Sequence, residues 1–150
     1  MVSVIVRSES GLRQEVTAGR HTFVADEPQA AGGTDTGPDP YALLLAALGA
    51  CTAMTLRLYA ERKKWPLAEI RIELSHSRIY AEDCAGCERP AAHVERITRT
   101  ILLSGPLDAD QVSRLAEIAK LCPVHKTLTG GVQVSDAVSI QPPPRQTSAS

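Results

Sequence analysis

The feature that most constrains this chain is an uncharged segment that runs from Tyr41 to Leu56 and is dominated by Ala and Leu. Both residues favour helix, and apolar side chains on every side of the first turns are typical of a helix buried in a protein core or in a membrane. The segment has sixteen residues, and charged residues follow at once, whereas a membrane span requires about 20. We therefore predict the central helix of a soluble domain.

The ends of this helix are marked by capping signals. Asp39 suits the N-cap, Pro40 suits the first helical position, and Pro66 predicts an end near Lys64. One helical face combines a cysteine with leucines, and we expect that face to meet the core: Leu44, Leu48, Cys51, Thr55 and Leu58.

Composition narrows the class of protein. The chain has 150 residues, 43% of them hydrophobic, which predicts one domain over residues 1–141 followed by a Pro- and Ser-rich tail over 142–150. A net charge of -1 and 3% aromatic residues argue against a nucleic-acid binder. The N-terminus does not resemble a secretion signal, so we expect a cytoplasmic protein that is not in a membrane. In a reducing compartment, its four cysteines indicate catalysis or metal binding.

Alternating apolar residues predict the strands. Residues 2–7, 14–17 and 20–25 should form an antiparallel meander, and residues 70–80 and 97–103 a long hairpin. Asp108 and Gln111 have the spacing of a capping box for a further helix, Pro123 opens a short one, and a last strand is predicted from Val132, Val134, Val138 and Ile140. The order indicates an α+β fold with antiparallel sheets packed around a long buried helix.

Two cysteines, Cys51 and Cys122, belong to apolar faces of two helices. Buried thiols are often inert small hydrophobes. However, Pro123 places Cys122 at a helix N-cap, where free N–H groups stabilise a thiolate, and His125 adds positive charge when protonated. The functional alternative is a dithiol and disulfide cycle through a sulfenic acid. Local physics favours Cys122 as the thiolate, since Cys51 is about three turns inside its helix.

Three segments carry a resemblance to a known family: Asp26-Glu27-Pro28, residues 37–56, and Cys122-Pro123-Val124-His125-Lys126-Thr127-Leu128. Together they resemble the OsmC/Ohr family of thiol peroxidases. The resemblance covers roughly residues 20–134. It implies an intertwined homodimer whose central helices are sandwiched between sheets, active sites completed by both subunits, and reduction of organic hydroperoxides.

The resemblance also implies roles for single residues. Cys51 would attack the peroxide, Cys122 would resolve the sulfenic acid, and Arg20 would keep the attacking thiolate anionic. The chain departs from the Ohr pattern at Tyr41, which occupies the position of a carboxylate, so that Asp39 or Glu27 would have to replace it. No organic cofactor is implied, and turnover would require an external dithiol reductant.

Cys84 and Cys87 form a separate C-x-x-C pair. We favour exposed loop thiols, and the second interpretation is a zinc site with His93 and with His76 or a partner subunit. The alternative to a peroxidase is a non-enzymatic dimer that binds a small apolar or thiol-reactive ligand in the same pocket, or a redox or zinc sensor that uses this pair.

Overall fold

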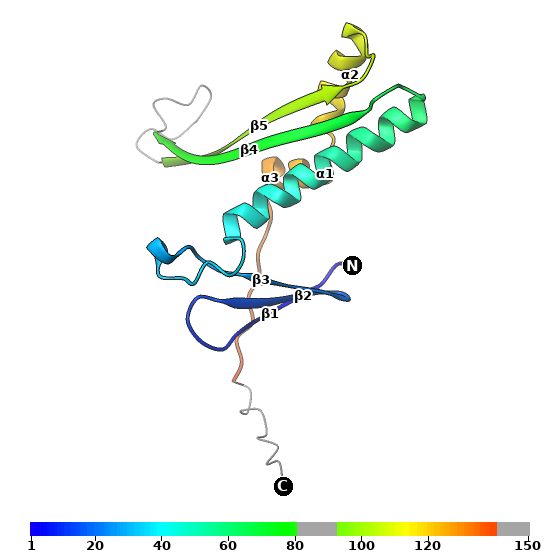
Figure 1. Cartoon of the computed structure of the whole chain (residues 1–150). Helices are drawn as coiled ribbons and strands as arrows, with labels where there is room; N and C mark the ends of the chain where they lie inside the picture. Colours follow the sequence, from blue (N-terminus) through cyan, green and yellow to red (C-terminus); the bar gives the residue numbers. More distant parts are fainter. Residues whose placement is uncertain (81–92, 141–150) are drawn as a thin grey trace.

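The structure is a computed structural model that describes residues 1–80 and 93–140. Within these residues the elements follow the order β-β-β-α-β-β-α-α. They are β1 (Val4–Ser8), β2 (Gln14–Ala18), β3 (His21–Ala25), a 3-10 turn (Gln29–Ala31), α1 (Pro40–Lys63), β4 (Glu69–Tyr80), β5 (His93–Ser104), α2 (Ala109–Ala119) and α3 (Pro123–Gly130). The predicted α+β class with antiparallel sheets is confirmed (Figure 1).

The first sheet is the predicted meander in the order β1-β2-β3. Val16 of β2 is paired with Val6 on one side and with Phe23 on the other. The two turns contain Gly11 and Gly19, both with φ of 62°, a conformation that glycine adopts without steric cost.

The second sheet is the predicted hairpin, in which β4 and β5 pair from Glu69 with Ser104 to Tyr80 with His93. Its connection, residues 81–92, lies outside the described residues, and so does the predicted pair Cys84 and Cys87. The predicted tail over 142–150 also lies outside them.

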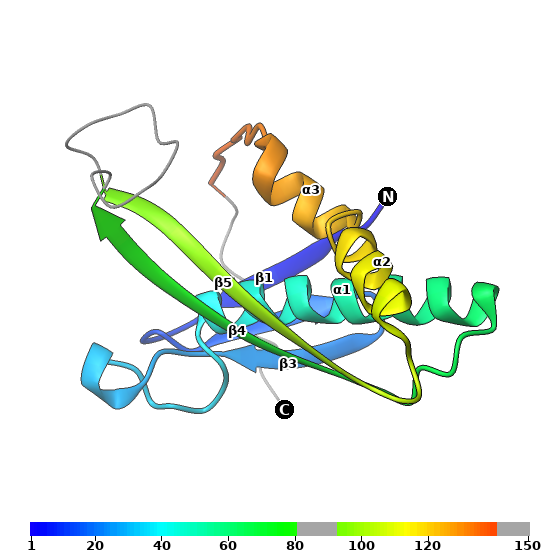
Figure 2. The ribbon, with the colours of Figure 1, turned by 90° about the horizontal axis from the view of Figure 1, so that it is seen from above.

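Helix α1 begins and ends close to the predicted positions. The Asp39 carboxylate accepts a hydrogen bond from the backbone N–H of Ala42 at 3.0 Å, Pro40 occupies the first turn, and Lys64 ends the helix in the left-handed conformation. The helix lies between the β1–β3 sheet and the β4–β5 hairpin (Figure 1). Seen from above, the hairpin crosses α1 obliquely, and α2 and α3 lie on the same side of α1 as the hairpin (Figure 2).

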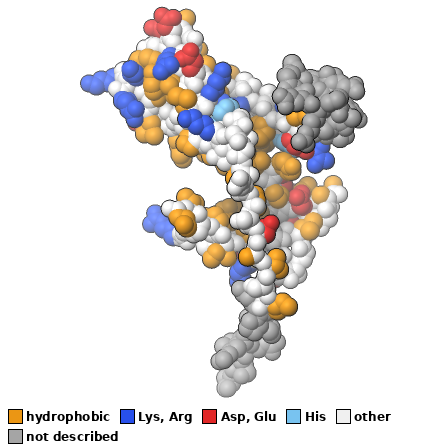
Figure 3. All heavy atoms as spheres, turned by 180° about the vertical axis from the view of Figure 1, so that it is seen from behind, with side chains coloured by type: hydrophobic (Ala, Val, Ile, Leu, Met, Phe, Trp, Pro, Cys, Tyr) orange, Lys and Arg blue, Asp and Glu red, His pale blue; other side chains and the backbone are white. Residues whose placement is uncertain are grey.

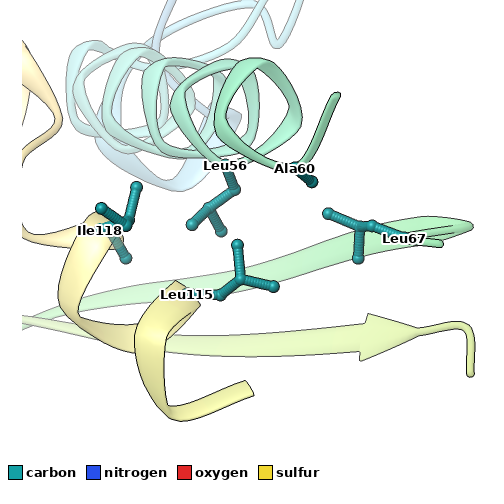
Figure 4. Close-up of a cluster of buried hydrophobic side chains, with 6 residues drawn as sticks. Leu56, Ala60, Leu67, Leu115 and Ile118 are labelled. Atoms are coloured by element: carbon teal, nitrogen blue, oxygen red, sulfur yellow. The ribbon is translucent and has the colours of Figure 1, made fainter. Parts of the chain in front are cut away.

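The core joins α1 to α2 and to the segment between α1 and β4 (Figure 4). The capping box of α2 is present, with the Gln111 N–H donating to Asp108 Oδ1 at 2.8 Å and the Gln111 side chain accepting from the Asp108 N–H at 3.0 Å. Its apolar stripe then packs against the second half of α1, and the buried residues are Leu56, Ala60, Leu67, Leu115, Ile118 and Ala119.

The loop that leads into α1 is held by one buried carboxylate. Asp26 is 2% exposed and accepts hydrogen bonds from the hydroxyls of Thr34 at 2.5 Å and Thr36 at 2.8 Å, and from the backbone N–H of Glu27. The Thr34 hydroxyl, followed by that of Thr36 and by backbone N–H groups, holds the pKa of Asp26 well below its usual range, although burial opposes this effect. This loop connects β3 to the start of α1.

Within the single chain the predicted central helix α1 is covered on one side only, and the expectation that Leu58 faces the core is wrong for the single chain. Leu48, Thr52 and Leu56 are buried, but Leu58, expected in the core, is 62% exposed, and Met54 is 65% exposed. The reason is that α2, α3 and the hairpin cover only one side of α1. Hydrophobic side chains are visible on both sides of the notch that separates the first sheet from the rest (Figure 3).

The predicted last strand is also wrong for the single chain. Residues 131–140 have no regular secondary structure, and four of their apolar side chains are exposed by 70% to 100%: Val132, Val134, Val138 and Ile140. A strand requires pairing with another strand as well as alternation of apolar residues, and no strand of the described residues pairs with this segment.

Candidate functional site

The two cysteines singled out in the sequence meet where α1 packs on α3. Cys122 is the N-cap of α3 with Pro123 following, and its carbonyl accepts from the Lys126 N–H at 3.1 Å. Cys122 is fully buried, Cys51 is partly exposed, and both are free thiols. They are close enough that each affects the pKa of the other.

The surroundings of the two thiols shift their pKa values in opposite directions. Burial, followed by interaction with Cys122, raises the pKa of Cys51. Burial alone would raise the pKa of Cys122 as well, but hydrogen bonds from Cys51, from the backbone N–H of His125 and from the Thr52 hydroxyl outweigh it and lower that pKa. Within one chain, the thiol at the helix N-terminus is therefore the more acidic one, as local physics predicted.

Two polar residues that sequence analysis did not select belong to this site: Thr52, which affects the pKa of Cys122, and Arg99, which is hydrogen-bonded to Thr52. Thr52 is fully buried on α1, and its hydroxyl oxygen accepts a hydrogen bond from Arg99 Nη1 at 2.7 Å. The same hydroxyl is 2.7 Å from the carbonyl oxygen of Leu48, to which it donates. Arg99 comes from β5 and has the same phase as Ile97 and Ile101. A charged residue in the inward phase of a strand was the available signal.

A cavity of about 530 Å³ opens next to these residues. Its walls combine apolar side chains from α1, β5 and α3 with polar ones, and the lining residues are Tyr41, Leu44, Leu48, His76, Glu95, Ile97, Arg99, His125, Leu128 and Thr129. Burial, followed by the charges of Arg99 and Lys120, lowers the pKa of His125. The imidazole therefore tends to be neutral near pH 7.

One end of the cavity carries a charged cluster. The ring of Tyr41 stacks on His76 with 4.2 Å between centroids, His76 Nε2 contacts Glu95 Oε2, and Arg78 Nε donates to Glu95 Oε1 at 2.7 Å. Burial acts to raise the pKa of Glu95, but Arg78 and His76 lower it overall. The cavity lining thus combines apolar side chains with part of an ionic cluster.

Arg20, the third predicted site residue, is not among the residues that line the cavity or that shift the pKa values of the two thiols. It is exposed in the turn between β2 and β3, and no ion pair involving it occurs in the described part of the chain. Asp39, considered as a replacement for the missing carboxylate, caps α1. Tyr41, which occupies that position, lines the cavity instead.

The weak zinc candidates stay a prediction, because most of them lie outside the described residues. Cys84 and Cys87 lie outside the described residues, as does the side chain of His93. Among residues 1–80 and 93–140, no group of three potential metal ligands is gathered. His76 is paired with Glu95.

The sequence model of the OsmC family, described as "OsmC-like protein", matches residues 33–135. The chain therefore belongs to the OsmC-like family, in agreement with the resemblance found in its sequence. No curated protein is similar enough in sequence to count as a match.

Solved structures show the same fold. A putative osmotic stress induced and detoxification response protein from Psychrobacter arcticus 273-4 has a TM-score of 0.67 at 20% identity, covering 85% of this chain and 88% of that one. An OsmC-like protein from Mycoplasma pneumoniae has a TM-score of 0.65 at 20% identity, with 87% and 86% covered. The organic hydroperoxide resistance protein OhrB of Bacillus subtilis has a TM-score of 0.59 at 24% identity, with 87% and 91% covered.

Helix α1 is long and apolar enough to cross a membrane by length and composition, although core helices of soluble proteins pass the same test. Only 22% of its most apolar window is buried within the chain. It lies inside the segment that the OsmC family matches, which agrees with a central helix of this fold.

Proposed function

We propose that the protein is a thiol-dependent peroxidase that reduces organic or small hydroperoxides through Cys51 and Cys122. The observation that carries the proposal is the meeting of these two thiols, one partly exposed and one held at a helix N-terminus, beside a cavity with an apolar wall. Membership of a family with solved structures named organic hydroperoxide resistance proteins supports it.

The reaction has three steps. The Cys51 thiolate attacks the terminal oxygen of ROOH, the O–O bond breaks, and the alkoxide leaves with a proton as ROH, which converts Cys51 to a sulfenic acid. The Cys122 thiolate attacks that sulfur, and hydroxide leaves with a proton as water while the disulfide forms. An external dithiol then returns two electrons, and no organic cofactor takes part.

The exposure of the two thiols and the directions of their pKa shifts support these roles for Cys51 and Cys122. Cys51 is partly exposed, so a peroxide can reach it, whereas Cys122 is fully buried. The lowered pKa of Cys122 suits the resolving step, because disulfide formation also requires a thiolate. Within one chain, burial and Cys122 outweigh the groups that lower the pKa of Cys51, and we propose that Arg20 of a second subunit stabilises its thiolate.

The second subunit is itself part of the proposal. The first sheet exposes Val4, Ile5, Val6 and Phe23, and α1 exposes Met54 and Leu58. Apolar surface of this extent is typical of a protein interface, and a three-stranded sheet needs a covered face for stability. We propose an intertwined homodimer, in the reducing cytoplasm where free thiols persist.

The test is hydroperoxide consumption with dithiothreitol as reductant. Cys51→Ser should abolish consumption of cumene hydroperoxide, and Cys122→Ser should stop turnover that depends on the disulfide. The matched control replaces Cys84 and Cys87 with Ser and should retain the parent rate. Unchanged consumption in Cys51→Ser would remove Cys51 from the mechanism, and loss of consumption only in the control would favour the sensor that uses the loop pair.

A further inference from the structure

The proposed mechanism gives no role to Arg99, although this charged residue belongs to the site. It lies in the inward phase of β5, is partly buried, and forms no ion pair with a carboxylate of residues 1–80 or 93–140. A guanidinium withdrawn from water loses solvation and requires compensation from acceptors or an anion. Its recorded partner is the neutral hydroxyl of Thr52, which does not balance the charge.

The hydrogen bonds of Thr52 determine what that hydroxyl does. A hydroxyl has one proton to donate and two lone pairs to accept with. Arg99 Nη1 occupies a lone pair at 2.7 Å, so the oxygen is an acceptor on that side. In the structure the single proton is donated to the Leu48 carbonyl at 2.7 Å, and the sulfur of Cys122, whose pKa this hydroxyl lowers, is the second acceptor.

We infer that Arg99 is a positioning residue that acts through Thr52 to stabilise the thiolate of Cys122. When Cys122 is protonated, the Thr52 proton is donated to the Leu48 carbonyl. When Cys122 ionises, the hydroxyl rotates and donates to the sulfur, while the guanidinium polarises the O–H bond from the other side. The thiolate supplies the negative charge that Arg99 lacks.

The inference rests on the proposed function for its purpose, because it makes Cys122 reactive in the resolving step. The other groups that face Cys122 are the neighbouring thiol Cys51 and, on α3, His125, which is also near Lys120. Burial and the charges of Arg99 and Lys120 favour neutral His125, so the cation that can act on this sulfur through Thr52 is Arg99, whose charge is permanent.

The test is a thiolate titration that uses no peroxide. In full-length protein with Cys51, Cys84 and Cys87 replaced by Ser, Cys122 is the single remaining cysteine of the original four, so absorbance at about 240 nm reports its ionisation. Arg99→Gln and Thr52→Val should each raise the midpoint by about 0.5 to 1 pH unit, below the range for an opposite charge in direct contact. Thr52→Ser should keep the parent midpoint.

A double-variant cycle tests whether the two residues act together. Because Arg99 is inferred to act through the hydroxyl, Arg99→Gln should add little in the Thr52→Val background. Arg96→Gln, which removes an exposed arginine of the same strand, is the matched control and should leave the midpoint unchanged. Arg99→Lys keeps the charge and should stay closer to the parent midpoint than Arg99→Gln. If Arg99→Gln does not fold, Thr52→Val carries the test.

Two results would overturn the inference. One is a Cys122 midpoint that stays at the parent value in Arg99→Gln or in Thr52→Val. The other is a shift of equal size with and without the Thr52 hydroxyl, which would mean that Arg99 acts directly on the sulfur or on a ligand in the cavity. Since the titration is independent of turnover, an inactive enzyme with the predicted midpoints would refute the peroxidase and leave this inference standing.

Discussion

Replacement of Leu56 by Ala should destabilise the protein strongly, because this side chain joins α1 to α2 in the core. Leu56 is fully buried among Ala60, Leu67, Leu115 and Ile118 (Figure 4). The change removes three carbon atoms, which is about 2.4 kcal/mol of transfer free energy. The substitution also leaves a cavity, because the surrounding elements cannot all move together to fill it. This cavity raises the expected loss of unfolding free energy to about 3 to 5 kcal/mol.

The assay is urea unfolding followed by circular dichroism at several protein concentrations, because dissociation would make the midpoint depend on concentration. In thermal melts the same loss corresponds to a decrease of about 6 to 20 °C for a chain of this size. Leu56→Met, which nearly conserves volume, is the control and should lose less than about 1.5 kcal/mol. A Leu56→Ala variant within about 1 kcal/mol of the parent would refute this account of the core.

Three further predictions concern backbone approach, acid stability and assembly. Gly37→Ala should prevent normal folding, because a Cβ there would be 2.1 Å from the Val24 carbonyl oxygen. Gly49→Ala should fold, because its Cβ would meet a movable leucine methyl at 2.9 Å. Soluble yield and melting temperature distinguish the two variants. Asp26→Asn should flatten the pH dependence of stability. Because folding lowers the pKa of the Asp26 carboxyl, its contribution to the free energy of unfolding is complete above the ordinary pKa of about 3.9 and is lost as pH falls toward the folded pKa. The urea midpoints of the parent and the variant should therefore converge between about pH 5 and pH 2. Midpoints that stay parallel over this range would contradict the assignment. Met54→Asp, on a side chain that is 65% exposed in one chain, should convert the proposed dimer to monomer in light scattering, and an unchanged mass would place the interface elsewhere.

The elements that were predictable from the sequence are those with local signals. Asp39 and Pro40 mark the start of α1, Asp108 and Gln111 form the capping box of α2, and Pro123 opens α3. Each signal involves groups within a few residues of one another, so the chain segment alone determines the hydrogen bonds. Alternation likewise predicted both antiparallel sheets.

The features that escaped prediction depend on contacts distant in sequence. Leu58 belongs to an apolar face, but periodicity does not show which face the rest of the chain covers. The valines near residue 132 alternate like a strand, yet no strand of the described residues pairs with them, and alternation does not show which edge a segment will join.

The site was predictable in part for the same reason. Helical faces and the Cys122-Pro123 pair indicated that Cys51 and Cys122 point toward the core. Arg99 and Thr52 meet across 47 residues of sequence, and only the tertiary packing of β5 on α1 brings them together. The inward phase of Arg99 among strand isoleucines was the one sequence signal for it.

The central claim is that Cys51 and Cys122 form a redox pair, and a peptide map by mass spectrometry after one equivalent of cumene hydroperoxide tests it most directly. The account predicts a Cys51–Cys122 disulfide, and in Cys122→Ser a sulfenic acid trapped on Cys51. Oxidation confined to Cys84 and Cys87, with both helix cysteines still reduced, would contradict it.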